Sequence, residues 1–291
     1  MAKARAIVKR RKTVQNIRKI TRTMQLIATA RFQAAYTRAT ASRPYTERIT
    51  ELAEQLSRGT GQIDHPLLRV NVESNRSAVV VITSNRGFCG GYNAAVLRAA
   101  TEHVRTAETA GRTVDLHVMG RKGIGFFKFL NRPMASTDTR FEDKPRFEDV
   151  NAFAERMIAA YQRREIDAVH VSYTRFISTS VQRAATIQLL PIERPAGADG
   201  AAAGAGVEYE FTPPAAELLA ELLPETVKVR LFQCFMDAAV SEQVARMVAM
   251  KSATDAAGDM VKSLTQQYNR ARQSQITLEL LDIVSGAEAI K

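Results

Sequence analysis

The chain has 291 residues, a net charge of +11, 45% hydrophobic residues, no Trp and two cysteines. This length permits one sizeable domain, or a smaller domain with extended elements. Cys89 and Cys234 lie far apart and form no C-x-x-C pattern, which indicates reduced thiols in a protein facing the cytosol. The sequence has no run of eighteen apolar residues and no apolar signal-peptide core, so we expect no membrane insertion.

The excess charge lies at the N-terminus. Residues 1–48 contain thirteen Lys and Arg and one acid, Glu47, which gives this segment +12, whereas the rest of the chain is nearly neutral. A solvated helix face does not need so much charge, so an acidic partner is favoured. Nucleic acid would satisfy the charge equally well, although no aromatic stacking platform accompanies it.

The first element is a predicted helix over residues 3–57. Ile17, Ile20, Met24 and Ile27 are spaced three or four apart, which predicts a coiled-coil seam. Pro44 predicts a kink, and the glycines near residue 60 predict the end of the helix.

The middle of the chain alternates between strand and helix patterns. Residues 78–83 form a β-branched run typical of a strand buried on both faces. Further strands are predicted over 114–119, 167–176 and 183–190, and helices over 93–110, 122–130 and 149–164. This alternation predicts a three-layer, Rossmann-like α/β domain with a mostly parallel sheet. Residues 195–206 are rich in Ala and Gly and predict a surface loop, and 207–211 an edge strand.

The last element is a predicted helix from residue 215 to 291. Its apolar and small residues are spaced alternately three and four apart, as in a coiled coil: Met247, Met250, Thr254, Ala257, Val261, Leu264, Tyr268 and Ala271. The N-terminal helix is the obvious antiparallel partner, which makes the α/β domain an insertion. The expected segments are therefore a helix at 1–58, an α/β domain at 70–212 and a helix at 213–291.

Beyond residue 271 the apolar residues point in every direction around the helix. They include Ile276, Leu278, Leu280, Leu281, Ile283 and Val284. A helix that is apolar all round must be enclosed. We therefore expect this end to work inside another protein.

No catalytic or metal-binding pattern appears in the sequence. It contains no phosphate-binding loop, no dinucleotide fingerprint and no G-x-S-x-G elbow, and its four histidines lack metal-ligand spacing. The turn containing Arg86 and Cys89 is open to three interpretations: an anion nest, a reactive thiol or a tight structural turn. We expect no catalytic residue, cofactor or metal.

Four separated motifs, of which the shaft motif consists of two stretches, together resemble the gamma subunit of F-type ATP synthases. They are residues 276–289, the shaft-like stretches 246–255 and 268–273, the N-terminal residues 17–24, and the turn at 86–91. The resemblance covers essentially the whole chain. It implies a non-catalytic rotor shaft that couples ion-driven rotation of the membrane ring to ATP synthesis or hydrolysis at the beta subunits.

The resemblance also implies partners and a location. The partners would be the alpha and beta subunits of the catalytic head, the epsilon subunit and the membrane ring of c subunits. The chain would be a peripheral subunit at the cytoplasmic face of the bacterial inner membrane, without nucleic acid.

The resemblance carries roles to particular residues. Arg272, Gln273 and Thr277 would grip a loop of beta, whereas Glu279, Arg246 and Met24 fall at positions tied to coupling. Arg86 and Cys89 would lie near an acidic region of beta, and Leu280, Leu281, Ile283 and Val284 would form the enclosed tip. Asn85 and Phe32 depart from the family pattern, so a salt bridge from position 85 is not expected.

Two alternatives stay open at this point. A basic coiled-coil protein that binds nucleic acid is favoured by the N-terminal charge. An α/β enzyme with a coiled-coil arm would require nucleotide binding, for which the sequence offers no motif.

Overall fold

The computed structural model describes residues 2–59, 65–141, 144–192 and 215–288. They form two compact units, one made of residues 30–245 and the other of residues 2–29 and 246–288. Helices α1 (Ala2–Gly59) and α5 (Ala215–Glu288) each contribute to both units.

The larger unit, residues 30–245, is built on a five-stranded sheet in the order β3-β2-β1-β4-β5. The strands are β1 (Arg76–Ile82), β2 (Thr113–Met119), β3 (Ser136–Asp138), β4 (Ala168–Phe176) and β5 (Gln182–Leu190). β1 pairs in parallel with β2 and β4, and β2 pairs in parallel with β3. Only β5, at the edge, pairs in antiparallel fashion, with β4.

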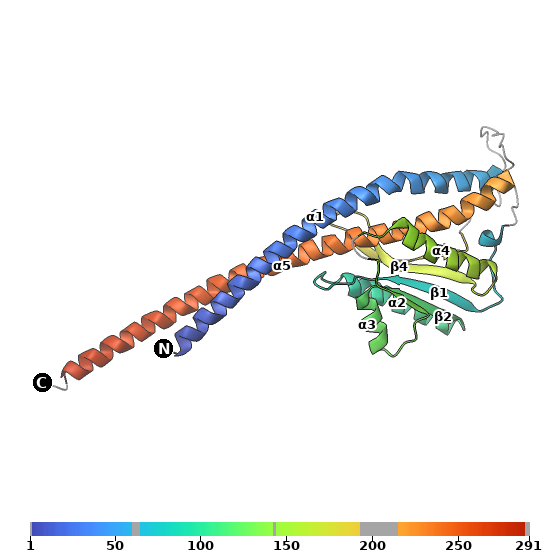
Figure 1. Cartoon of the computed structure of the whole chain (residues 1–291). Helices are drawn as coiled ribbons and strands as arrows, with labels where there is room; N and C mark the ends of the chain where they lie inside the picture. Colours follow the sequence, from blue (N-terminus) through green and yellow to red (C-terminus); the bar gives the residue numbers. More distant parts are fainter. Residues whose placement is uncertain (1, 60–64, 142–143, 193–214, 289–291) are drawn as a thin grey trace. The chain divides into compact units, whose positions relative to one another are not determined.

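The central strand β1 divides the core into two halves. Val79 and Val81 pack with apolar residues of α2 (Tyr92–Thr109) and α3 (Arg121–Phe129). Val80 and Ile82 face the other way, toward α4 (Phe147–Gln162) and the first turns of α5. Because successive side chains of a strand alternate between faces, this β-branched run needs helices on both sides. Figure 1 shows α4 on one face of the sheet and α2 and α3 on the other.

This arrangement confirms the predicted three-layer, mostly parallel α/β fold. The sequence patterns placed the four longer strands and all three helices of the insertion within about two residues. They missed the three-residue strand β3 and the short 3₁₀ helix Pro66–Leu68, because segments of this length show no periodicity. The edge strand predicted at 207–211 and the loop at 195–206 lie outside the described residues.

The smaller unit is an antiparallel pair of helix segments. Val14 of α1 packs with Ala257 and Leu264 of α5, and Thr254 donates a hydrogen bond to Thr21 across the pair at 2.8 Å. Toward the N-terminus, the Arg11 guanidinium lies 5.4 Å from the centroid of the Tyr268 ring. These contacts confirm the antiparallel coiled coil and the seam predicted on α5, none of whose eight positions is exposed.

The seam predicted on α1 was wrong. Ile17, Ile20 and Ile27 are 47%, 59% and 48% exposed, and only Met24 is half-buried. The buried positions are instead Val14, Thr21 and Ala28, which are spaced seven apart. Small and hydroxyl side chains allow the two helices to approach closely, so the larger isoleucines of α1 face outward. α1 continues as one helix through Pro44, and the kink expected there stays a prediction.

The packing of α5 bears on how the chain is divided. Leu219, Leu223, Val227 and Leu231 of α5 belong to the core of the sheet. The early part of the 213–291 segment thus forms part of a layer of the α/β unit. The division into 1–58, 70–212 and 213–291 stays a proposal about sequence segments.

Replacing Leu264 with Asp should destabilise the helix pair by a few kcal/mol. Leu264 is 5% exposed among Val14, Ala257 and Val261, so the variant would bury a carboxylate without a partner. Thermal melting followed by circular dichroism measures the loss. Gln266→Asp, which adds the same charge at an exposed position of α5, is the control. Equal melting temperatures for the two variants would contradict the packing described here.

Lowering the pH should destabilise the α/β unit through His170. Its ring packs against that of His103 of α2 at a tilt of 50° with centroids 4.3 Å apart, and His170 Nδ1 is buried without a hydrogen-bond partner among the described residues. Burial, followed by the neighbouring His103 and Arg112, lowers the pKa of His170 to about 4. Between pH 6.5 and 4 the unfolded chain therefore binds a proton that the folded chain excludes, and stability falls as the pH falls.

The expected loss attributable to His170 is up to about 2 kcal/mol between pH 7 and pH 5. Urea unfolding of the parent chain and of His170→Asn at both values measures it. The variant should lose this share of the pH dependence and retain the share that comes from carboxylates. Identical pH dependence in the two proteins would refute the assignment to His170.

Candidate partner-binding sites

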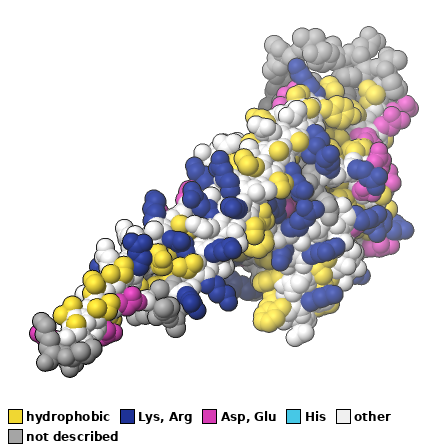
Figure 2. Space-filling model, turned by 60° about the vertical axis from the view of Figure 1, so that its left-hand side comes forward, with side chains coloured by type: hydrophobic (Ala, Val, Ile, Leu, Met, Phe, Trp, Pro, Cys, Tyr) yellow, Lys and Arg dark blue, Asp and Glu magenta, His cyan; other side chains and the backbone are white. Residues whose placement is uncertain are grey.

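The terminal segment of α5 exposes large apolar side chains. Ile276, Leu278, Leu280, Leu281, Ile283 and Val284 are 47% to 67% exposed, and no residue from 276 to 288 is buried. Figure 2 shows hydrophobic side chains gathered toward this end of the chain. Soluble proteins rarely leave a contiguous apolar surface uncovered unless it serves as a contact. The structure leaves these side chains on the surface of the described chain, and their enclosure by a partner stays a prediction.

A polar collar, Arg272, Gln273, Thr277 and Glu279, precedes and overlaps this apolar segment. All four side chains are exposed. Two of them are held by the helix itself: Thr277 Oγ1 donates to the Gln273 carbonyl at 3.0 Å, and Glu279 accepts from Gln275 at 2.9 Å. Within the described ranges the side chains of Arg272 and Gln273 make no hydrogen bond or ion pair, so both are available to another chain.

Met24 and Arg246 differ in their surroundings from the collar. Met24 is half-buried on α1, and Arg246 of α5 is only 7% exposed. A guanidinium with so little exposure is held by its surroundings, since burying an unpaired charge is costly. A direct contact with a partner through Arg246 would therefore involve a small part of its surface.

Part of the N-terminal charge gathers around a surface hollow of the helix pair. The hollow has a volume of about 1000 Å³, and Arg18, Lys19 and Arg22 line it on the α1 side, beside Thr254 and Asp255 of α5. Arg18 lies against Gly258 of α5, where an added Cβ would be 3.6 Å from the Arg18 side chain, an ordinary van der Waals distance. Three cations against one acid make this hollow an attractive surface for carboxylates.

Arg86 and Cys89 are close in sequence, in the turn between β1 and α2, but they differ in how far their side chains are exposed. Cys89 is 2% exposed, and its sulfur accepts a hydrogen bond from Asn93 Nδ2 at 3.2 Å, whereas Arg86 is exposed. Ser84 Oγ donates to the Arg86 carbonyl at 2.7 Å. Of the three interpretations of this turn, the geometry favours the tight structural turn, with Cys89 as an internal anchor and Arg86 at its surface.

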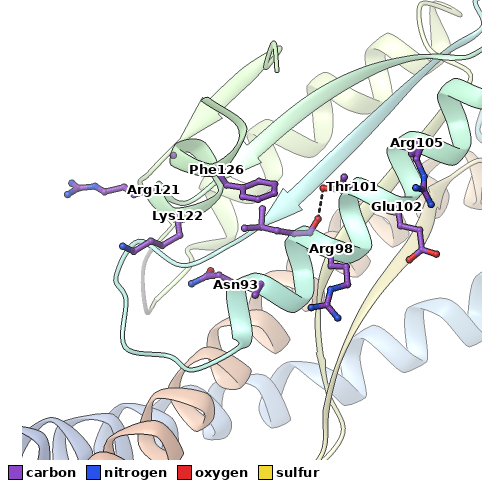
Figure 3. A pocket seen from close by; sticks show the side chains of 11 residues that line it. Asn93, Arg98, Thr101, Glu102, Arg105, Arg121, Lys122 and Phe126 are labelled. Atoms are coloured by element: carbon purple, nitrogen blue, oxygen red, sulfur yellow. Dashed lines mark hydrogen bonds between the residues drawn. The ribbon is translucent and has the colours of Figure 1, made fainter. Parts of the chain in front are cut away.

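The sequence analysis missed a groove between α2 and α3, shown in Figure 3. Its volume is about 1030 Å³, and Arg98, Arg105, Arg121 and Lys122 line it. The only sequence signal was the seven-residue spacing of Arg98 and Arg105, which places both on one helix face. Nothing in the sequence shows that this face lies beside Arg121 and Lys122.

The glycine-rich stretch 120–125 has a structural role. Gly120 has a φ of 97°, and a Cβ there would lie 2.1 Å from the Thr83 carbonyl oxygen. A Cβ on Gly123 would lie 2.7 Å from Thr83 Oγ1. These glycines let the start of α3 pack against the end of β1, and among the described residues no group of three or more potential ligands is placed to hold a metal ion.

Comparisons with known proteins place the chain in a class. The family described as ATP synthase matches residues 3–290. The "ATP synthase gamma chain" of Rhodopirellula baltica is 47% identical over 296 residues and is covered completely, as is this chain. The protein of the same description from Frankia casuarinae is 41% identical over 286 residues, which is 97% of this chain and 96% of the relative.

The fold is also found in solved structures. A chain of the Euglena gracilis mitochondrial ATP synthase OSCP/F1/c-ring structure superimposes with a TM-score of 0.72 at 19% identity, covering 99% of this chain and 95% of that one. A chain of the Tetrahymena thermophila mitochondrial ATP synthase central stalk and c-ring gives a TM-score of 0.59 at 19% identity, covering 80% of this chain and 99% of that one. At this identity the likeness concerns the fold.

The class is thus that of the ATP synthase subunits. Within it, the extent and identity of the matches show that this chain belongs to the gamma chain family. The resemblance inferred from the four sequence motifs is confirmed.

Proposed function

We propose that this chain is the rotor shaft of an F-type ATP synthase and couples ion-driven rotation of the membrane ring to ATP synthesis or hydrolysis. The observation that carries the proposal is the exposed apolar end of α5 in a chain of the gamma family. The chain itself is not an enzyme. The catalytic sites belong to the beta subunits.

The two kinds of surface at the end of α5 suit two mechanical tasks. The exposed apolar residues Ile276, Leu278, Leu280, Leu281, Ile283 and Val284 are spread over more than half of the helix circumference, so an enclosing apolar sleeve would contact apolar side chains at most rotation angles. Such contacts resist turning little, because the hydrophobic effect has no direction. This segment is suited to be the bearing of the shaft.

The polar collar is suited to transmit force. Hydrogen bonds and ion pairs depend on orientation, so Arg272, Gln273, Thr277 and Glu279 would engage one beta subunit at a time as the shaft turns. Met24 and Arg246 would act in coupling from the helix pair. Arg86 would meet an acidic region of beta, while Cys89 keeps the turn of Arg86 in shape.

The partners follow from the same role. They are the alpha and beta subunits of the catalytic head, the epsilon subunit and the ring of c subunits. None of the described helices is long and apolar enough to cross a membrane. The proposed location is peripheral, at the cytoplasmic face of the bacterial inner membrane, within the complex.

The nucleic-acid alternative receives no support from the relatives reported above. Its basis was the +12 segment, of which three cations line the hollow beside Thr254. Steeply salt-dependent binding of DNA or RNA to the chain, with no affinity for an alpha-beta ring, would restore that alternative.

The rotor proposal is tested by reconstituting the chain with alpha and beta subunits and a bead. Cys89 and Cys234 are 2% and 3% exposed, and burial raises the pKa of the Cys234 thiol to about 12. A cysteine introduced at the exposed Lys128 of α3 would therefore react selectively and attach the bead. We expect the bead to rotate during ATP hydrolysis. Hydrolysis by the assembled ring without rotation would refute the proposal.

Substituting Arg272 or Gln273 with Ala should weaken coupling without affecting folding. Both side chains are exposed and lie beyond the buried contacts of the helix pair. The free energy of unfolding should therefore change by less than about 0.5 kcal/mol. ATP synthesis driven by a proton gradient in reconstituted vesicles should fall severalfold.

The matched control is Gln266→Ala, at an exposed position of the same helix that precedes the collar. It should leave synthesis unchanged. Full synthesis in both Arg272→Ala and Gln273→Ala, or an equal loss in the control, would contradict the assignment of the collar.

A further inference from the structure

We propose that the groove between α2 and α3 binds an acidic, amphipathic helix of a partner protein. The inference rests on the groove alone and does not depend on the rotor assignment. Figure 3 shows its labelled residues on the two helices, with Phe126 of α3 on the side of α2 that carries Thr101.

The shape of the groove fits an elongated ligand. Its lining follows α2 from Asn93 to Arg105, which at 1.5 Å per residue is about 18 Å along the helix. The volume of about 1030 Å³ is at the upper end of the range for drug-sized ligands. A run of this length matches about three turns of a helix laid alongside α2, a known mode of peptide recognition.

The floor of the groove is apolar. Leu97 and Ala94 come from α2, and Gly125 and Phe126 come from α3. Phe126 is half-buried, with its ring 5.3 Å from that of Phe127, so it is anchored in the core while part of it lines the groove. A Cβ added to Gly125 would meet no atom within 4 Å, which shows that the groove is open there. Such a floor suits the apolar face of an amphipathic helix.

The rim of the groove is positively charged. Arg98 and Arg105 lie on α2, Arg121 and Lys122 lie on α3, and Glu102 is the one acid in the lining. All five side chains are exposed, and within the described part of the chain none of them has a hydrogen-bond or ion-pair partner. Four cations beside an apolar floor favour a ligand that combines carboxylates with apolar side chains.

A phosphate-bearing ligand fits less well. The start of a helix usually binds phosphate through free backbone N–H groups. Here the Arg121 amide donates to Asn85 Oδ1 at 3.0 Å, the Lys122 amide to the Ser84 carbonyl at 3.1 Å and the Gly123 amide to Thr83 Oγ1 at 2.9 Å. Because these amides are already used, only flexible side chains remain for an anion. An elongated set of carboxylates uses these cations better than a compact phosphate.

The spacing of the charges sets the pattern of the partner. Arg98 and Arg105 are seven residues apart, about 10.5 Å along α2, which corresponds to two carboxylates seven residues apart on the partner helix. Glu102 lies between the two arginines and would pair with a Lys or Arg placed between the two carboxylates. Along its polar face the partner helix is thus expected to carry an acidic residue, then a basic residue, then a second acidic residue.

A photo-crosslinking amino acid at Gly125 tests this inference in the full chain, expressed with its natural partner proteins. The position lines the groove and is open, so a larger side chain fits without displacing the core. After irradiation, mass spectrometry identifies the crosslinked peptide. We expect a helical segment of one partner protein with two Asp or Glu residues seven apart.

Charge reversal supplies the second arm. Arg98→Glu with Arg105→Glu should reduce the crosslink yield at least tenfold. Lys128→Glu with Arg183→Glu, at exposed positions outside the groove, should leave the yield unchanged. Circular dichroism checks that both double variants are folded.

A synthetic peptide of the crosslinked segment, labelled for fluorescence anisotropy, completes the test. It should bind the purified chain, and a peptide with Lys in place of its acids should bind at least tenfold more weakly. The inference is overturned by crosslinks to lipid or to segments without the acidic pattern, by the absence of any protein crosslink, or by equal yields in the two double variants. Displacement of the peptide by millimolar inorganic phosphate at constant ionic strength would also overturn it, in favour of a phosphate site.

Discussion

The apolar side chains of α5 must be covered along the length of the helix, and this requirement governs the rest of the structure. Its first turns are buried against the sheet through Leu219, Leu223 and Leu231. Further along, Met250, Ala257 and Leu264 are buried in the pair with α1. From Ile276 onward no part of the described chain covers it. Since burial of apolar area is the main favourable contribution to folding, the uncovered end is the part whose stability depends on another protein.

The sequence predicted those parts of the fold whose residues carry a strong periodic signal. The β-branched run of β1 predicted a strand buried on both faces, and the three-four spacing on α5 predicted the coiled-coil seam of that helix. The seam of α1 escaped prediction, because Thr21 and Ala28 are weakly hydrophobic and the more hydrophobic Ile17 and Ile20 face outward. A hydrophobic pattern records which residues avoid water, whereas close helix packing selects for small size.

The candidate sites divide in the same way. The apolar end of α5 could be predicted because an all-round apolar helix is visible in one continuous stretch of sequence. The groove between α2 and α3 could not be predicted. Arg98 lies on α2, before β2, and Lys122 lies on α3, after β2, so the two residues come together only when both helices pack on the sheet. Cys89 shows a third case: a cysteine in a glycine-rich turn suggests chemistry, and only the 3.2 Å contact with Asn93 reveals an internal anchor.

A subunit that turns against one neighbour while staying fixed to another needs two opposite kinds of surface. Contacts that are non-directional allow turning, and the apolar residues at the end of α5 are of this kind. Contacts that depend on the spacing of charges fix one orientation, and the four cations of the α2–α3 groove are of that kind. The polar collar of α5 is a second directional surface, and it lies on the same helix as the apolar end. A charge introduced at Leu281 should therefore disturb rotation, whereas a charge reversed at Arg105 should release a partner without hindering the turn.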